Sequence, residues 1–185
     1  MRASLVGVWV VVVVCVAGAC SSVALEQETS GATVIHLVRH AEKAEDAGSD
    51  PPLSEVGLKR ADALAAELLG AGVGRILSTP FDRTHSTATP LAAAIEVEIE
   101  LMEVASLEAH IDEMATIITS DIGARFLVVG HSNTVPLLVA RLGGPEFEID
   151  ETEYGDLFIV TLDQDDVQFS RSRYGDSVVN RGSGE

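Results

Sequence analysis

The chain of 185 residues is long enough to form one ordinary domain and leaves little for a second. Its formal net charge of −17 argues against nucleic acids and anionic membrane surfaces as partners, so a phosphate site would have to be a local exception. Because only two lysines occur, Lys43 and Lys59, arginines would have to supply most of the positive charge at such a site.

The first 24 residues have the composition of an export signal. Arg2 precedes an apolar run from Leu5 to Ala19, which is short for a membrane span and ends in small residues. Two cleavage sites fit the sequence. Cleavage before Cys20 would produce a lipidated protein, since the site resembles a bacterial lipobox, whereas cleavage after Ala24 would release the chain. We expect an exported protein, either a cell-envelope lipoprotein attached to the membrane through Cys20, which we favour, or a secreted or periplasmic form.

A linker is expected at 25–32, followed by one domain at 33–175 and a flexible tail at 176–185. Within the domain, β-rich and alternating runs predict strands, while helical apolar spacing, capping residues and breakers predict helices. The expected strands are 33–38, 75–79, 96–101, 125–130, 155–162 and 167–174, and the expected helices are 54–69, 80–94, 108–120 and 133–142.

Strands that alternate with helices indicate a three-layer α/β/α fold with a mostly parallel sheet. In such sheets, ligands bind at the carboxyl ends of the strands. The loops after Val38, Leu77 and Val129 should therefore lie at one rim of the sheet.

These three loops carry two arginines and two histidines. Arg39 and His40 follow the first strand, Arg83 lies in the first turn of a helix, and His131 follows the fourth strand. Taken singly, each is explained as a polar or exposed side chain. Together they supply a nucleophile, an arginine clamp for phosphate and a charge-stabilising imidazole, the parts needed for phosphoryl transfer without a metal.

Four motifs between Thr33 and Leu142 occur in the order found in the histidine phosphatase superfamily, in its phosphoglycerate-mutase-like branch 1: LVRHAEK, LSEVGLKRADALA, ILSTPFDRTHSTATPLA and VVGHSNTVP. The chain resembles small bacterial phosphatases of that branch. The resemblance implies a phosphoglycerate-mutase-like fold and a phosphohistidine intermediate on His40. It also implies that Arg39, Arg83 and His131 bind the phosphoryl group, with Asn133 as a further polar contact.

The resemblance further implies a carboxylic acid that protonates the leaving oxygen. Glu103 follows a predicted strand towards the same rim, but it is equally well explained as a surface carboxylate, and Glu108 is a weaker candidate. We interpret His36, His85 and His110 as structural, with His110 on a polar helix face. No histidine pair has metal-ligand spacing, and no glycine-rich loop indicates a nucleotide cofactor, so neither is expected.

The expected function is a metal-independent phosphatase that acts on small phosphorylated substrates, either phosphomonoesters or phosphohistidine- or phospholipid-type phosphates. Three alternatives stay open: a phosphate-binding module on the same scaffold, a phosphoglycerate-mutase-type phosphotransferase, and a serine hydrolase. Gly130-His131-Ser132 resembles the serine elbow of hydrolases, but no histidine follows Ser132 to act as its base. The oligomeric state is not predicted.

Overall fold

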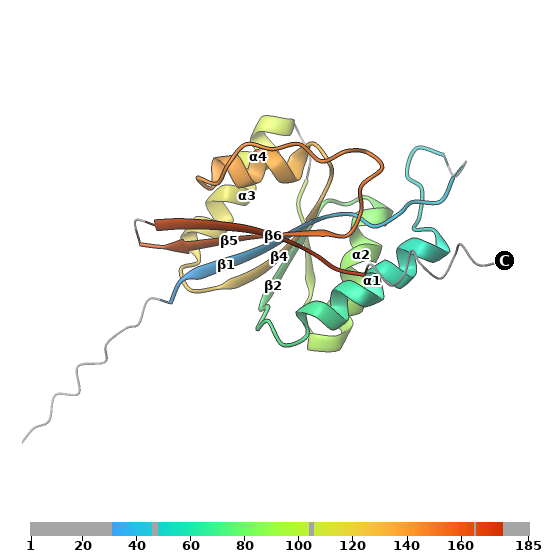
Figure 1. The fold of residues 1–185 in the computed structure, drawn as a ribbon, viewed down its shortest axis with the longest axis horizontal. Coiled ribbons are helices and arrows are strands. Elements are labelled where there is room, and N and C mark those ends of the chain that lie inside the picture. Colours follow the sequence, from blue (N-terminus) through green and yellow to red (C-terminus); the bar gives the residue numbers. More distant parts are fainter. Residues whose placement is uncertain (1–30, 46–47, 104–105, 165, 176–185) are drawn as a thin grey trace, which may run out of the picture.

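The computed structural model describes residues 31–45, 48–103, 106–164 and 166–175 (Figure 1). The expected signal segment with Cys20, most of the linker and the C-terminal tail lie outside the described residues. Among the described residues, no helix is long and apolar enough to cross a membrane. The elements follow the chain as β1 (Thr33–Arg39), α1 (Glu55–Leu68), β2 (Arg75–Ser78), α2 (Asp82–Ile95), β3 (Ile99–Leu101), α3 (Leu107–Ser120), β4 (Arg125–Gly130), α4 (Thr134–Arg141), β5 (Asp156–Asp163) and β6 (Asp166–Arg173).

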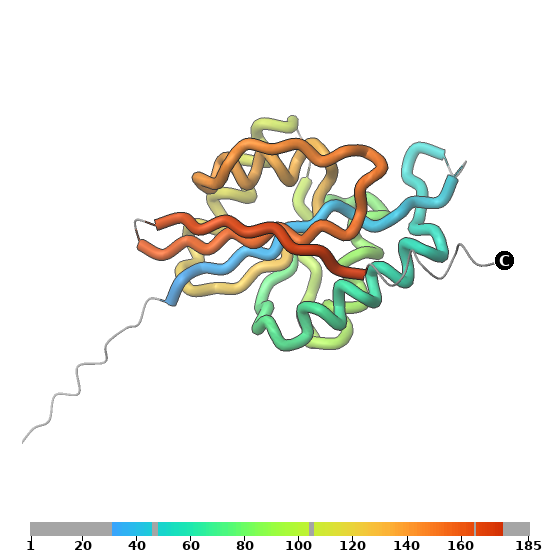
Figure 2. Tube along the Cα trace, viewed as in Figure 1, coloured from blue at the N-terminus to red at the C-terminus, as the bar shows by residue number. Residues whose placement is uncertain are grey.

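The six strands form one mixed sheet in the order β3-β2-β4-β1-β5-β6. The pairs β3–β2, β2–β4 and β4–β1 are parallel, as expected for strands joined through helices. The last two strands form an antiparallel hairpin, and β5 pairs antiparallel to β1 (Figure 2). The four parallel strands thus direct their carboxyl ends to one rim.

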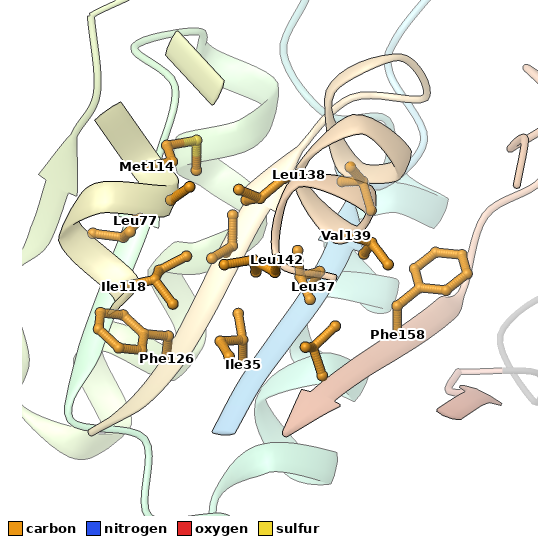
Figure 3. Close-up of a cluster of buried hydrophobic side chains, with 14 of the residues drawn as sticks. Ile35, Leu37, Leu77, Met114, Ile118, Phe126, Leu138, Val139, Leu142 and Phe158 are labelled. Carbon is orange, nitrogen blue, oxygen red and sulfur yellow. The ribbon is translucent and has the colours of Figure 1, made fainter. Parts of the chain in front are cut away.

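Helices cover both faces of the sheet: α3 and α4 lie on one side, and α1 and α2 on the other (Figure 1). This arrangement follows from the alternation of side chains along each strand. Ile35 and Leu37 of β1 pack in the cluster beneath α3 and α4, where Phe126 and Phe158 also lie (Figure 3), while Val38 packs with the apolar residues of α1 and α2. The predicted three-layer α/β/α fold with a mostly parallel sheet is confirmed.

The strand predicted at 96–101 is shorter than expected. Glu96 ends α2 in the left-handed conformation, with a φ of 56°, and the Val97 amide donates to the Ala92 carbonyl. Residues 96–98 therefore belong to the termination of a helix, and β3 begins only at Ile99.

The placement of His110 on a polar helix face was wrong. His110 is 1% exposed, and its Nδ1 lies 3.3 Å from the Glu103 carbonyl oxygen. The spacing of His110, Met114 and Ile118 along α3 is four residues, so all three lie on the stripe that faces the sheet.

Candidate active site

The carboxyl ends of β1, β2 and β4 surround a pocket of about 530 Å³. The backbone N–H of His40 donates to the Gly130 carbonyl oxygen at 2.9 Å, which continues the parallel β1–β4 pairing one residue beyond β1. This bond brings the loop after β1 beside the loop after β4. As a result, the imidazole rings of His40 and His131 approach to 5.4 Å between centroids.

His40 is 5% exposed, and its loop is held on two sides. The His40 Nδ1 lies 2.8 Å from the carbonyl oxygen of Ala41, and the Ala41 N–H donates to Thr87 Oγ1 at 2.9 Å. A carbonyl oxygen only accepts, so Nδ1 must carry the proton and Nε2 is left with a free lone pair. Burial lowers the pKa of His40 to about 4; the hydrogen bond with the Ala41 carbonyl opposes this lowering, and the charges of Arg39 and Arg83 add to it. At neutral pH this imidazole is therefore uncharged, which is the form that is able to act as a nucleophile.

His131 is positioned by the turn that begins α4. Its backbone N–H donates to Thr134 Oγ1 at 2.8 Å, and its Nε2 lies 3.1 Å from Thr79 Oγ1. The turn requires glycine at position 130, because a Cβ there would lie 2.7 Å from Thr134 Oγ1. Burial, together with the positive charge of neighbouring side chains that include His40 and Arg83, lowers the pKa of His131 to about 3. A phosphoryl dianion beside it would favour the protonated form.

Arg39 is almost completely buried, with a side chain that is 4% exposed. Its Nη1 donates to the carbonyl oxygens of Asp150 and Glu153, and its Nη2 donates to the Glu151 carboxylate at 2.8 Å. The guanidinium lies over the Tyr154 ring, 4.4 Å from its centroid. Its buried Nε has no hydrogen-bond partner among the described residues.

Arg83 lies in the first turn of α2, as predicted. Its guanidinium lies over the Phe81 ring at 4.5 Å and contacts the Asp50 carboxylate at 3.3 Å. The side chain lines the pocket together with His40 and His131. A cation at a helix N-terminus is electrostatically unfavourable by itself. An anion bound between the Arg83 guanidinium and the N-terminus of α2 would be stabilised by both.

The structure brings most of the predicted site residues together. His40, Arg83, His131 and Asn133 all line the pocket, and the exposed Lys43 lines its mouth. Arg39 does not line the pocket itself, but its Nη2 donates to the carboxylate of Glu151, which does.

The two candidate acids lie elsewhere. Glu103 is exposed just beyond β3 and is not among the described residues that line this pocket. Glu108, in the first turn of α3, lines a neighbouring apolar pocket instead.

Sequence reasoning missed Thr79, Phe81 and Glu151, which line the pocket, and Tyr154, whose ring centroid lies 6.3 Å from that of His40. The first two precede Arg83 in the STPFDRT segment and were detectable by their position in that loop. The other two belong to the loop before β5, which folds back over Arg39, and no local pattern marks them. His36 is buried with its Nδ1 3.1 Å from the Phe126 carbonyl, and His85 is exposed.

Residues 35–108 match the sequence model of the histidine phosphatase superfamily (branch 1). A search of curated protein sequences found no match. Solved structures resemble the chain over most of its length. A protein histidine phosphatase, SixA, complexed with tungstate has 23% identity and a TM-score of 0.62, and the match covers 80% of this chain and 99% of that one.

Two further solved structures show the same likeness. YhfR of Bacillus stearothermophilus has 15% identity and a TM-score of 0.62, with 79% of this chain and 99% of that one covered. A phosphoserine phosphatase of Entamoeba histolytica, in complex with 3-phosphoglyceric acid, has 13% identity and a TM-score of 0.60, with 80% and 99% covered. At these identities the likeness establishes the fold alone. The chain thus combines the fold of these phosphatases with a segment, residues 35–108, that matches the histidine phosphatase superfamily (branch 1).

Proposed function

We propose that this protein is a member of the histidine phosphatase superfamily that hydrolyses phosphomonoesters through a covalent phosphohistidine on His40. The observation that carries the proposal is a buried imidazole with Nδ1 engaged by the Ala41 carbonyl and Nε2 free. Its lowered pKa keeps it unprotonated at neutral pH. A second imidazole and two guanidinium groups lie around the same pocket, which is the set of donors that a transferring phosphoryl group needs.

In the proposed reaction, Nε2 of His40 attacks phosphorus and the bond from phosphorus to the leaving oxygen breaks. The electron pair of that bond leaves with the oxygen, which takes a proton from a general acid. Water then attacks phosphorus and gives one proton back to the general acid, the nitrogen–phosphorus bond breaks with its electron pair returning to Nε2, and inorganic phosphate is released. Arg39 and Arg83 hold the phosphoryl oxygens, and His131, protonated once the dianion is bound, balances their charge.

We propose Glu103 as the general acid. Its side chain does not line the pocket in the structure, but it follows β3, whose carboxyl end lies at the same rim as those of β1, β2 and β4. Asn133 is proposed as an additional polar contact, since it lines the pocket at the start of α4. The substrate is a small phosphorylated compound. If Cys20 is lipidated after export, substrates at a membrane surface, including phospholipid-type phosphates, become accessible to this site.

The decisive experiment is to trap the intermediate. The purified domain is mixed with a ³²P-labelled phosphate donor, quenched rapidly in alkaline detergent, and tested for label that is stable in base and released by acid. Wild-type protein should carry such label and hydrolyse p-nitrophenyl phosphate in the presence of a chelator. His40→Asn should show neither property. Substantial turnover by His40→Asn would contradict the assignment.

A phosphate-binding module is the second candidate, because the site would also hold a phosphorylated ligand without chemistry. It predicts saturable binding of phosphate with neither label nor turnover in the wild type. The serine-hydrolase alternative has less support, since the Ser132 hydroxyl donates to the Glu151 carboxylate while His131 Nε2 lies against Thr79. A mutase would return the phosphoryl group to a second substrate hydroxyl, and the label would then be recovered in an ester and not as inorganic phosphate.

A further inference from the structure

The carboxylate of Glu151 lies inside the pocket that holds His40 and Arg83. One of its oxygens accepts a hydrogen bond from Arg39 Nη2 at 2.8 Å, and the other accepts one from the Ser132 hydroxyl. The Ser132 hydrogen bond and the charge of Arg39 lower the pKa of Glu151, so the group is ionised at neutral pH. The pocket therefore contains a carboxylate that is charged at neutral pH, beside the Arg39 guanidinium that the proposed function assigns to phosphate binding.

Glu151 is also able to move. Its side chain is 75% exposed, so breaking its bond to Arg39 exposes little additional surface to water. The Arg39 side chain is 4% exposed and is anchored by two backbone carbonyls, so it stays in place. When a phosphoryl group takes the Arg39 donor, the Glu151 carboxylate must give up its contact with Arg39.

A second cavity, of about 620 Å³, is also lined by Glu151. It shares Ser132, Asn133 and Glu151 with the catalytic pocket. Apolar side chains, among them Phe147 of the loop before β5, form part of its lining. Its charged lining consists of carboxylates, Glu146, Glu148 and Glu151, and no lysine or arginine is among the described residues that line it. A leaving group that extends from the phosphorus into this cavity would meet an apolar wall and negative charge.

We propose that Glu151 is a specificity-determining residue that selects phosphorylated substrates whose leaving group carries a positive charge, such as an ammonium group. A cation in the second cavity pairs with the displaced Glu151 carboxylate, whereas an anionic leaving group is repelled by it. This inference rests on the proposed function, because it assigns the leaving-group side of the same site.

The test uses three substrates that have nearly the same size but differ in charge: 2-aminoethyl phosphate (cationic), ethyl phosphate (neutral) and carboxymethyl phosphate (anionic). Values of kcat/KM are measured for the wild type and for Glu151→Gln, and the variant-to-wild-type ratio is taken for each substrate, which cancels differences in leaving-group reactivity. The cationic substrate should lose about three- to tenfold relative to the neutral one, and the anionic substrate should gain by a similar factor, as expected for loss of one exposed charge pair. Inorganic phosphate should also inhibit the variant more strongly.

The matched control is Glu113→Gln, which removes one exposed carboxylate from α3 outside both cavities and should leave the three ratios equal within about twofold. Equal ratios for Glu151→Gln, or the same pattern in the control, would overturn the role of Glu151 while phosphatase activity and the phosphohistidine label stand. A wild-type domain that turns over none of the substrates and carries no label would overturn both proposals. A cation preference that disappears only in Glu151→Gln supports the inference.

Discussion

A histidine attacks phosphorus only while its attacking nitrogen is unprotonated, so burial of His40 has a direct chemical consequence. With an ordinary pKa near 6.5, part of the imidazole would be protonated at pH 7. Burial and two neighbouring guanidinium groups lower the pKa to about 4, so the whole population is neutral. The positive charges that are proposed to bind a phosphoryl group thus add to the effect of burial, which keeps the proposed attacking nitrogen unprotonated.

Arg83 shows how geometry adds to charge. Its planar guanidinium lies over the ring of Phe81, which fixes the direction of its N–H donors. Lysine would retain the charge but lose the fork that holds two oxygens at once. We predict that Arg83→Lys lowers kcat/KM for p-nitrophenyl phosphate on the order of 100-fold, the loss typical for one charged donor to a transition state.

The control for this substitution is Arg125→Lys, at the opposite end of the sheet, where the guanidinium contacts the Ala71 carbonyl. It should change kcat/KM by less than about twofold, since it is remote from the reacting atoms. If Arg83→Lys were as active as this control, Arg83 would not bind the phosphoryl group.

Among the elements, α1 holds the loop that carries His40, the proposed nucleophile. The helix begins after Ser54, whose hydroxyl accepts the Gly57 N–H at 3.1 Å. Arg60, 2% exposed, forms hydrogen bonds of 2.6 to 2.9 Å to both oxygens of Glu42, two residues after His40. The start of α1 is therefore packed directly against the segment that positions the site.

Gly57 permits this contact. An alanine Cβ at position 57 would lie 2.1 Å from the Glu42 carbonyl oxygen, so the loop would have to shift. Alanine favours a helix by about 1 kcal/mol over glycine, but overpacking costs about 1–3 kcal/mol. The overpacking cost opposes the helical gain, and the contact here is with the backbone, so we expect it to prevail. We predict that Gly57→Ala destabilises the protein and lowers kcat, measured by urea unfolding and steady-state kinetics. Gly70→Ala is the control, because a Cβ there meets no atom within 4 Å, and an equal effect of the two would refute the packing argument.

Sequence patterns predicted the helices and strands well because most of these elements pack one face against the core, which leaves a periodic pattern of apolar residues. The strands β1 and β4 are mostly apolar and thus indicate a covered sheet, and the first residues after them were assigned correctly to the rim. The local patterns failed where an element ends or turns back. The left-handed Glu96 removes half of the predicted third strand, and the loop that brings Glu151 onto Arg39 is a long-range contact across 112 residues.

At the scale of the whole molecule, two effects of acid oppose each other. The net charge of −17 means that protonating carboxylates relieves repulsion in the folded state. The buried histidines act in the other direction. Burial lowers the pKa of His36, His40 and His131, so in the range between their folded pKa and about 6.5 the unfolded chain binds more protons than the folded one.

Because the unfolded chain binds more protons in this range, the histidines are predicted to make the protein less stable as the pH falls. Stability from a lowered histidine pKa is fully present above about pH 6.5 and is lost as the pH falls towards 4, the pKa of His40 in the folded state. Between pH 7.5 and 4.5 this amounts to a loss on the order of 2–3 kcal/mol for each of His40 and His131. Urea unfolding at the two pH values should therefore show a smaller acid loss in His40→Gln and in His131→Gln than in the wild type. Because all three proteins share the same carboxylates, the comparison removes their contribution. An acid loss in both variants equal to that of the wild type would mean that neither imidazole is kept neutral by the fold, and the argument for His40 as a nucleophile at neutral pH would lose its physical basis.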